Sequence, residues 1–323
     1  MEYRALGSTS VEISRIGFGC GPASGYDYGP IDEAEWKAAV RVALDAGVTL
    51  FDVANVYGFG RAEELLAEAL GERRLEVVIA TKCGLAWDDR GRVYRDLTPS
   101  GVRGALEGSL RRLRVDCVPL YQIHWPDPVV AIEETMDALA RCQNEGKIRF
   151  VGVGNFPPEL LERAFGAHRF ESQQIAFNLL HRQPERDVFP WAEAAGVSNL
   201  AHSALARGLL AGRRPIGTEF GPADTRGRSP YFSAQGKAAK QRLLDAIRVA
   251  AAETGKPFAS VAIRWLLDHP QMSTVLVGMK NRKQAEENLD AVGWKLAPET
   301  LETLSELSTA CPGGLAGIPA HAA

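Results

Sequence analysis

The chain has 323 residues, of which 46% are hydrophobic and 24% charged, and its formal net charge is −3. This composition is typical of a globular protein, and the chain contains nothing close to the ~18 consecutive apolar residues of a membrane span. Its slight acidity and lack of basic runs argue against nucleic acid as the main partner, and the opening MEYRALGSTS lacks the pattern of a secretory signal.

The five cysteines are an odd number, lie far apart and form no C-x-x-C pair. This spacing favours neither a disulfide framework nor a zinc site, and it fits a reducing compartment better than an oxidising one. We therefore expect a cytoplasmic protein that holds no metal ion.

Short apolar runs recur along the chain, and most are followed by a stretch with helical spacing. The predicted strands are Ile16–Gly19, Leu50–Asp52, Val77–Lys82, Val118–His124, Ile148–Asn155, Gln173–Phe177, Asn199–His202 and Thr274–Val277. Asp32 is the predicted N-cap of a helix that runs to Gly47, and Pro99 lies in the first turn of another. Strands such as VPLYQIH are almost continuously apolar, which is typical of parallel strands buried on both faces.

Eight strands alternating with helices predict an α/β fold, a (β/α)8 TIM barrel with an N-terminal β-hairpin, as one domain over residues 1–323. The alternative is a doubly wound open sheet, which normally carries G-x-G-x-x-G at its first strand–helix turn. GFGCG has the wrong spacing and GVGNFP lacks the third glycine, so the barrel is favoured. Leu85–Leu97 and Ala204–Gly236 depart from the regular rhythm and are expected to be extended, irregular βα-loops at its mouth.

Polar side chains end or interrupt six of the predicted strands. They are Asp52, Lys82, His124, Asn155, Gln174 and His202. In a barrel these strand ends meet at one mouth, which is the catalytic face of the fold. Each has a structural explanation by itself: Asp52 as a cap, His124 as a core histidine, Lys82 as a rim charge. Their joint occurrence at one face favours a catalytic site.

Tyr57, five residues after Asp52, can bring a phenol back over this mouth. A phenol has a pKa near ~10, and an ammonium about 4 Å away contributes roughly 4 kcal/mol at an effective dielectric of ~20, so Lys82 would lower that pKa. Asp52 could hold the lysine, and His124 could hydrogen-bond a carbonyl oxygen. This set suits protonation of an oxyanion while hydride reaches its carbon. Because no side chain donates hydride, a nicotinamide cofactor is required.

Segments spread over nearly the whole chain carry a family resemblance. They include RALGSTSVEISRIGFGCG, DVANVYGFGRAEELLAEAL, ATKCG, LYQIHWPDP, GKIRFVGVGNF, QQIAFNLLHR, SALARGLLAGR and VLVGMKNRKQAEENLDA. Together they resemble the aldo-keto reductase family, and WPDP, ALARGLL and GLAWDDRGRV look closest to its bacterial branch near the inositol-operon reductases. The resemblance implies that Tyr57 is the proton donor, that Lys82 lowers its pKa, that Asp52 pairs with this lysine and that His124 orients the carbonyl.

The resemblance also implies an NADPH/NADP+ site that extends across the barrel mouth without a Rossmann fold. The implied cofactor residues are Gly19, Cys20, Asn155, Gln174, His202, Ser203, Leu205, Arg207, Gly278, Lys280, Arg282, Gln284, Glu287 and Asn288. Among these, Asn155 and Gln174 would hold the nicotinamide carboxamide. Ser203, Leu205 and Arg207 would lie along the pyrophosphate, and Gly278–Asn288 would take the adenosine end.

A cluster of cations supports that adenosine end independently. Lys280, Arg282 and Lys283 lie at the start of a predicted helix, and both a helix N-terminus and added basic side chains favour a phosphate group. The alternative is a solvated basic helix end with no ligand. NADPH is therefore preferred over NADH as the expected cofactor.

Two positions depart from the family pattern. Gly154 replaces the serine that commonly precedes the nicotinamide-binding asparagine, and His202 replaces the aromatic residue, usually tyrosine, that stacks on the nicotinamide. Since an unperturbed histidine has a pKa of about 6.5, we expect weaker NADP+ binding below that pH. The loop GCGPASGYDYG also lacks the tryptophan often found there.

The leading interpretation is an enzyme that reduces a small-molecule aldehyde or ketone, with no nucleic-acid or membrane partner. One alternative is a Schiff-base aldolase with Lys82 as nucleophile, which gives the basic segment no role. Another is a cofactor-sensing regulatory subunit with slow turnover. The expected rim residues are Trp87, Trp125, Tyr94 and Arg226. A polar hydroxylated or anionic substrate such as a sugar would be admitted by the polar loop residues Asp88, Arg90, Arg92, Tyr94, Arg226 and Tyr231, although solvated loop charges are the simpler explanation of most of them.

Overall fold

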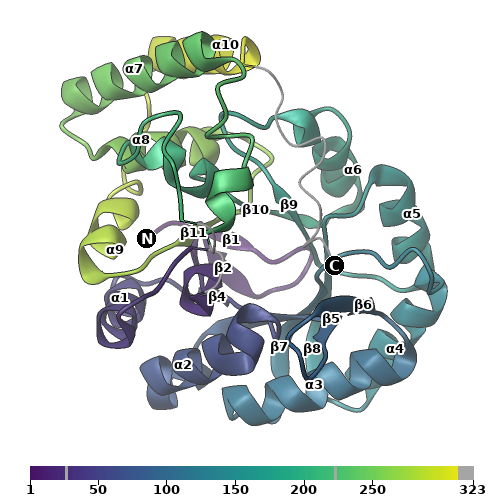
Figure 1. The fold of residues 1–323 in the computed structure, drawn as a ribbon. Helices are drawn as coiled ribbons and strands as arrows, with labels where there is room; N and C mark the ends of the chain where they lie inside the picture. The colour runs from purple at the N-terminus through teal and green to yellow at the C-terminus, as the bar shows by residue number, and fades with distance from the viewer. Residues whose placement is uncertain (26–27, 222–223, 312–323) are drawn as a thin grey trace.

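The structure is a computed structural model that describes residues 1–25, 28–221 and 224–311. Within these residues, eight parallel strands form the central sheet of Figure 1. They are β3 (Ile16–Gly19), β4 (Leu50–Asp52), β5 (Val78–Trp87), β7 (Val118–Ile123), β8 (Ile148–Gly154), β9 (Ser172–Ala176), β10 (Ser198–His202) and β11 (Thr274–Gly278). The sheet closes because β4 pairs with both β3 and β5, which confirms the predicted barrel. Residues 26–27, 222–223 and 312–323 of the predicted domain lie outside the described residues.

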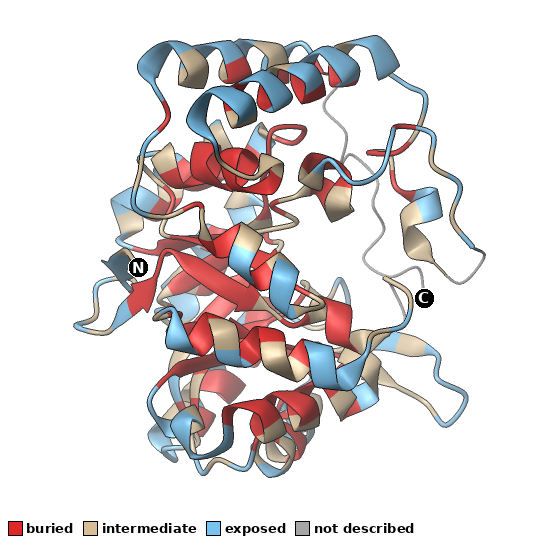
Figure 2. Ribbon diagram, turned by 90° about the vertical axis from the view of Figure 1, so that its left-hand side faces the viewer, coloured by how far each residue is buried: buried red, intermediate tan, exposed pale blue. Residues whose placement is uncertain are grey.

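Helices surround the barrel (Figure 1). They are α1 (Glu33–Asp45), α2 (Arg61–Leu70), α3 (Pro99–Leu113), α4 (Ile132–Asn144), α5 (Pro158–Ala167), α6 (Val188–Ala195), α7 (Lys237–Thr254), α8 (Phe258–Asp268), α9 (Arg282–Leu289) and α10 (Pro298–Thr309). The predicted N-cap is confirmed, since the Asp32 carboxylate accepts hydrogen bonds from the backbone N–H of Ala34 and Glu35 at 2.8 and 3.1 Å. The helices bury their inner faces against red, buried strands and expose their outer faces (Figure 2).

An N-terminal hairpin closes one end of the barrel. Strands β1 (Tyr3–Ala5) and β2 (Glu12–Ser14) pair antiparallel, as predicted. Leu6 and Ile13 of this hairpin pack against the first residues of the barrel strands, among them Leu50 and Val78. Burial of these side chains fills the N-terminal end of the barrel. The carboxyl ends of the strands, at the opposite end, form the mouth.

The stretch expected to be an irregular loop after the third barrel strand is an ordered hairpin. Strand β5 continues to Trp87 and pairs antiparallel with β6 (Val93–Asp96). The Asp88 carboxylate accepts hydrogen bonds from the backbone N–H of Arg90 and Arg92, both at 2.9 Å, and organises the turn. The expectation was wrong because the polar residues of this stretch belong to the turn and the exposed face of a hairpin rather than to an unstructured loop.

The loop between β10 and α7 is long and contains two short 3-10 helices, Ala206–Ala211 and Thr225–Arg228. It lies over the barrel mouth and contributes the side chains of Arg207 and Arg226 to the cavity described below. The expected extended βα-loop is therefore present at this position.

Candidate active site

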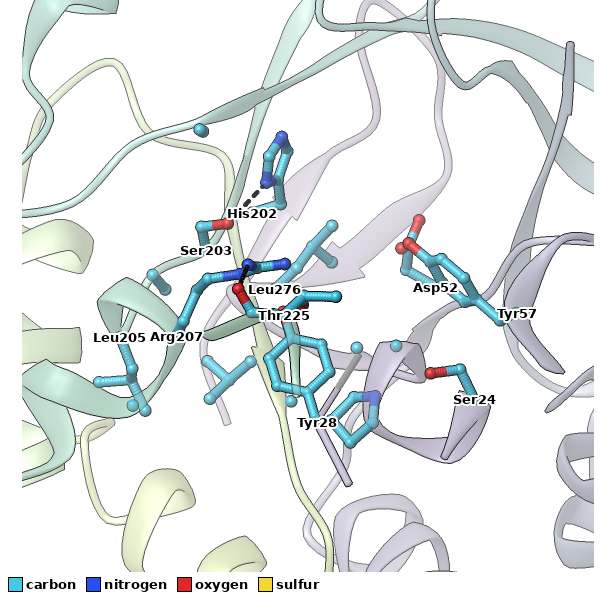
Figure 3. A pocket seen from close by; sticks show the side chains of 18 of the residues that line it. Ser24, Tyr28, Asp52, Tyr57, His202, Ser203, Leu205, Arg207, Thr225 and Leu276 are labelled. Carbon is cyan, nitrogen blue, oxygen red and sulfur yellow. Dashed lines mark hydrogen bonds between the residues drawn. The ribbon is translucent and has the colours of Figure 1, made fainter. Parts of the chain in front are cut away.

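The mouth of the barrel contains a cavity of about 1960 Å³. Its lining includes most of the residues expected there, namely Gly19, Asp52, Tyr57, His124, Trp125, Asn155, Gln174, His202, Ser203, Leu205, Arg207, Arg226, Gly278, Lys280, Gln284 and Asn288. Other expected residues are not in the lining: Cys20, Lys82, Trp87, Tyr94, Arg282 and Glu287. Figure 3 shows Asp52 and Tyr57 on one side of the cavity, with His202, Ser203 and Arg207 on the other.

An ion pair lies at the cavity floor, with Asp52 in the lining and Lys82 behind it. The Lys82 ammonium is 2.6 Å from Asp52 Oδ1 and also donates to the backbone carbonyl of Val53 at 2.9 Å. The two side chains are only 2% and 6% exposed. A pair this deeply buried is stable only when the remaining hydrogen-bonding capacity is satisfied.

Two glutamines meet that requirement at the second oxygen of Asp52. Gln122 Nε2 donates to Oδ2 at 3.1 Å and Gln174 Nε2 donates to it at 2.8 Å. Gln122 was not expected in the site, although it lies two residues before His124 in a strand whose side chains alternate between faces. It holds the carboxylate of the ion pair in place from inside the barrel.

Tyr57 and His124 lie together above this ion pair. Their ring centroids are 5.7 Å apart with the planes at 81°, and the Lys82 ammonium lies 5.4 Å from the centroid of the Tyr57 ring. A tight turn brings the phenol back over the mouth, because Gly58 and Phe59 adopt positive φ angles of 59° and 53°. A phenol, a cation and an imidazole therefore share one corner of the cavity.

On the opposite side, His202 connects two neighbouring loops. Its Nε2 lies 2.9 Å from Asn155 Oδ1 and its Nδ1 lies 3.0 Å from the Ser203 hydroxyl (Figure 3 shows the second contact). Burial, assisted by the charge of Lys82, lowers the pKa of His202 to about 3. The imidazole is therefore neutral at physiological pH, and this direction opposes the expected loss of NADP+ binding below about pH 6.5, which requires a protonated ring.

Cations gather at the far end of the cavity. Lys280 Nζ donates to the backbone carbonyls of Tyr28, Gly29 and Pro30 at 2.5, 3.3 and 3.4 Å. Burial lowers the pKa of Lys280, and the nearby charges of Arg226 and Arg214 lower it further. The Asp224 carboxylate opposes part of this effect on the pKa of Lys280. A group of cations such as this favours an anionic ligand, which would relieve their mutual repulsion.

The loops at this end are linked across the cavity. Arg226 pairs with Asp224 at 2.5 Å and donates to the Tyr28 carbonyl at 3.4 Å. Arg207 lies over the Tyr28 ring, 5.5 Å from its centroid, and donates to the Thr225 carbonyl at 3.3 Å (Figure 3). The segment around Tyr28 and the loop after β10 therefore contact each other through side chains that line the cavity.

Two residues expected at the adenosine end point elsewhere. Arg282 pairs with Glu286 at 2.8 Å on the exposed side of α9, and Glu287 pairs with Arg213. Gln284 and Asn288, which line the cavity, are four residues apart and so share a face of this helix. The residues expected to bind the cofactor from α9 therefore fall into two groups: Gln284 and Asn288 line the cavity, whereas Arg282 and Glu287 do not.

Strained backbone is concentrated at the mouth. Among the described residues, six non-glycine residues have positive φ, and five of them follow barrel strands: Phe59, Asn155, Ser203, Ala206 and Arg207. The sixth, Arg114, ends helix α3. Each such conformation costs on the order of 1–3 kcal/mol and persists where the surrounding structure imposes it, most often at functional sites.

Residues 1–25, 28–221 and 224–311 contain no cluster of three or more His, Cys, Asp or Glu side chains arranged to hold a metal ion. None of the helices in these ranges is both long enough and apolar enough to cross a membrane.

A family profile and a curated relative both match most of the chain, and both are of aldo-keto reductases. The profile of the Aldo/keto reductase family matches residues 15–309. Aldo-keto reductase YhdN of Bacillus subtilis is 34% identical over 313 residues, which cover 95% of this chain and 93% of that protein.

Solved structures are similar over the same extent. The glycerol dehydrogenase AKR11B4 from Gluconobacter oxydans superimposes with a TM-score of 0.88 at 33% identity, covering 97% of this chain and 96% of that one. The holo form of aldo-keto reductase AKR11C1 from Bacillus halodurans gives a TM-score of 0.80 at 27% identity, with 97% of both chains covered.

Proposed function

The chain belongs to the aldo/keto reductase family of oxidoreductases, and we propose that it is an NADP(H)-dependent carbonyl reductase with Tyr57 as proton donor. One observation carries the proposal: a buried Asp52–Lys82 ion pair lies directly beneath a phenol and an imidazole at the barrel mouth. Together these groups provide a proton donor and a positive charge, which protonation of an oxyanion requires.

Each side chain then has a separate task. His124 hydrogen-bonds the carbonyl oxygen of the substrate and orients it. Tyr57 transfers its phenolic proton to that oxygen as negative charge develops there, and the Lys82 ammonium stabilises the phenolate that remains. Asp52 fixes the lysine and is itself held by Gln122 and Gln174. The cofactor, when bound, supplies the hydride that the protein cannot.

The cavity lining supports the proposed binding of an extended dinucleotide with an additional phosphate. The amides of Asn155 and Gln174 lie at the end nearest the catalytic groups and suit a carboxamide. Lys280, with Arg226 and Arg214 nearby, lies at the other end and suits a phosphate monoester. This separation of amides from cations supports NADP(H) over NAD(H).

A Schiff-base reaction at Lys82 is disfavoured by the same geometry. Its ammonium is committed to Asp52 and to the Val53 carbonyl, and its side chain does not line the cavity. An amine nucleophile must instead be neutral and accessible to the carbonyl carbon.

For the substrate, we propose a short hydroxylated aldehyde or ketone, or the matching polyol in the reverse direction. Support comes from the glycerol dehydrogenase among the structural relatives and from the polar groups on the cavity wall, including Ser24, Arg92 and Asp187. Trp125 and Phe59 supply an apolar wall beside Tyr57.

The proposal is tested by following the absorbance of the reduced nicotinamide with a panel of carbonyls. NADPH and NADH are each offered with glyceraldehyde, dihydroxyacetone, aldoses and benzaldehyde, and glycerol with NADP+ tests the reverse direction. We expect turnover with NADPH to exceed that with NADH, and hydroxylated carbonyls to be reduced with the higher kcat/KM. Tight NADPH binding without turnover on any carbonyl, or borohydride trapping of a substrate on Lys82 without cofactor, would contradict the proposal.

A further inference from the structure

A directed chain of hydrogen bonds links three strand ends at the mouth. Asn155 Nδ2 donates to the backbone carbonyl of His124 at 2.9 Å, and its Oδ1 lies 2.9 Å from His202 Nε2. His202 Nδ1 in turn lies 3.0 Å from the Ser203 hydroxyl. The chain thus runs from β10 through the end of β8 to the end of β7.

Chemistry fixes the direction of each bond. A backbone carbonyl only accepts, so the amide nitrogen of Asn155 must face His124 and its oxygen must face His202. An amide oxygen also only accepts, so His202 must carry its proton on Nε2. Because the neutral imidazole has one proton, Nδ1 accepts from the Ser203 hydroxyl. The Asn155 amide cannot flip without losing two hydrogen bonds.

Gly154 makes the close approach of β8 to β7 possible. A Cβ atom at this position would lie 3.0 Å from both the His124 and the Ile123 carbonyl oxygens. This is shorter than ordinary van der Waals contact, so a side chain would push the end of β8 away from β7. Asn155, the next residue, would then lose the His124 carbonyl to which it donates.

We propose that His202 is a positioning residue that fixes the carboxamide of Asn155 in one orientation, and that Gly154 is its required partner. The inference rests on the proposed function, in which Asn155 meets the nicotinamide carboxamide. With Oδ1 held by His202, the second N–H of Asn155 is presented to the cavity as a donor. Both edges of the imidazole are used, so its face can remain toward the cavity that it lines.

The test compares two substitutions that separate the hydrogen bond from the ring. His202→Phe keeps an aromatic face and removes the Nε2 donor, whereas His202→Gln removes the face and keeps a donor at the Nε2 position. His168→Phe is the matched control, since His168 lies on the barrel exterior, where it bonds Gln143. Thermal unfolding of each variant identifies any that fails to fold.

Dissociation constants are measured for NADP+ and for 2′-phospho-ADP-ribose, which lacks the nicotinamide. We expect His202→Phe to weaken NADP+ binding by about tenfold, the effect of one orienting hydrogen bond, and to change binding of the truncated ligand by less than about twofold. His202→Gln retains NADP+ affinity within about threefold of wild type. Equal weakening of both ligands by His202→Phe, or a loss in His202→Gln as large as in His202→Phe, overturns the proposal.

A double-mutant cycle tests the partnership with Gly154. If both residues act through Asn155, Gly154→Ala weakens NADP+ selectively, and the variant that also carries His202→Phe is no weaker than the weaker single variant. Additive losses overturn the partnership. If the wild-type protein binds NADP+ more tightly than the truncated ligand, and His202→Phe keeps this preference unchanged, only the role of His202 is contradicted. If the wild-type protein itself lacks the preference, the proposed function and the positioning role are contradicted together.

Discussion

The two ends of the cavity are built differently. At the catalytic end, Lys82 and Asp52 are 2% and 6% exposed, and every partner comes from a barrel strand or from its first residues beyond. At the far end, which is proposed to take the adenosine and is called the adenosine end below, Lys280 is held by backbone carbonyls of one loop, and Arg226 by Asp224 within another. The first end is fixed by strand register, whereas the second is held together by loops.

This difference separates the chemistry from the choice of ligand. Buried, fully bonded charges cannot change partners without a large desolvation cost, so they suit a step that is the same for every substrate. Partly exposed cations bonded to carbonyls can exchange those partners for a phosphate at little cost. Substitutions at the catalytic end should therefore have large effects that salt does not change, and those at the adenosine end smaller effects that salt weakens.

The largest effect is expected for Lys82→Met. Removal of the cation leaves Asp52 buried without its partner, so we expect a loss of about 3–5 kcal/mol in the free energy of unfolding. Turnover should also fall by at least about 100-fold, because the phenolate of Tyr57 loses its stabilising charge. Urea unfolding and carbonyl reduction measure the two effects. Lys256→Met, which breaks a partly exposed pair with Asp290, is the control and should cost less than about 1 kcal/mol.

A smaller effect is expected at the adenosine end. Lys280→Met should raise the KM for NADPH by about tenfold and leave that for NADH nearly unchanged, since one charge-assisted contact to the phosphate is lost. Lys283→Met is the control, because Lys283 lies three residues further along, in helix α9, is 82% exposed and is absent from the cavity lining. The proposed difference between the two ends would be contradicted if both variants raised the KM values for NADPH and NADH alike. It would also be contradicted if a higher salt concentration did not reduce the preference of the wild-type protein for NADPH.

The smallest effect concerns pH. Because the pKa of His202 is lowered to about 3, its charge does not change between about pH 5.5 and pH 8, and NADP+ affinity should vary by less than about twofold there through this residue. The unfolded chain takes up this proton near its ordinary pKa of about 6.5. Burial of the neutral ring therefore contributes stability that is complete above that pH and is lost progressively below it.

Two measurements check this prediction. Titration of NADP+ binding against pH should be flat, and the stability of the wild-type protein should decline more steeply below about pH 6.5 than that of His202→Phe. An affinity that falls near pH 6.5 in the wild-type protein, and no longer does so in His202→Phe, would show that the histidine is charged after all.

The same contrast explains what could be predicted from the sequence. The strand ends near Asp52 and His124 were predictable because the apolar runs stop where these parallel strands reach the mouth, whereas β5 continues past Lys82 to Trp87. Gln122 was not predicted because it lies inside an apolar run, whereas the predicted site residues were those at the ends of such runs. The alternation of side chains along LYQIH, however, places Gln122 on the same face as His124.

The loops resisted prediction for a different reason. In α9, Arg282 bonds Glu286 one turn later, while Gln284 and Asn288 occupy the face toward the cavity. Which face of so short and polar a helix turns inward depends on how it packs against α1 and α8, and the sequence of the helix itself carries little hydrophobic signal. Similarly, the turn after Trp87 depends on side-chain hydrogen bonds from Asp88 that composition does not reveal.

Tyr57→Phe separates the proposed proton transfer from cofactor binding, because it removes one oxygen atom from the cavity and leaves the ring, the ion pair and the far cations in place. Cofactor binding, followed by protein fluorescence, and carbonyl reduction are measured on the same preparation. We predict NADPH binding within about twofold of wild type, together with a fall in kcat of about 100-fold or more, the contribution typical of a general acid. A Tyr57→Phe protein that reduces carbonyls at the wild-type rate would contradict the account.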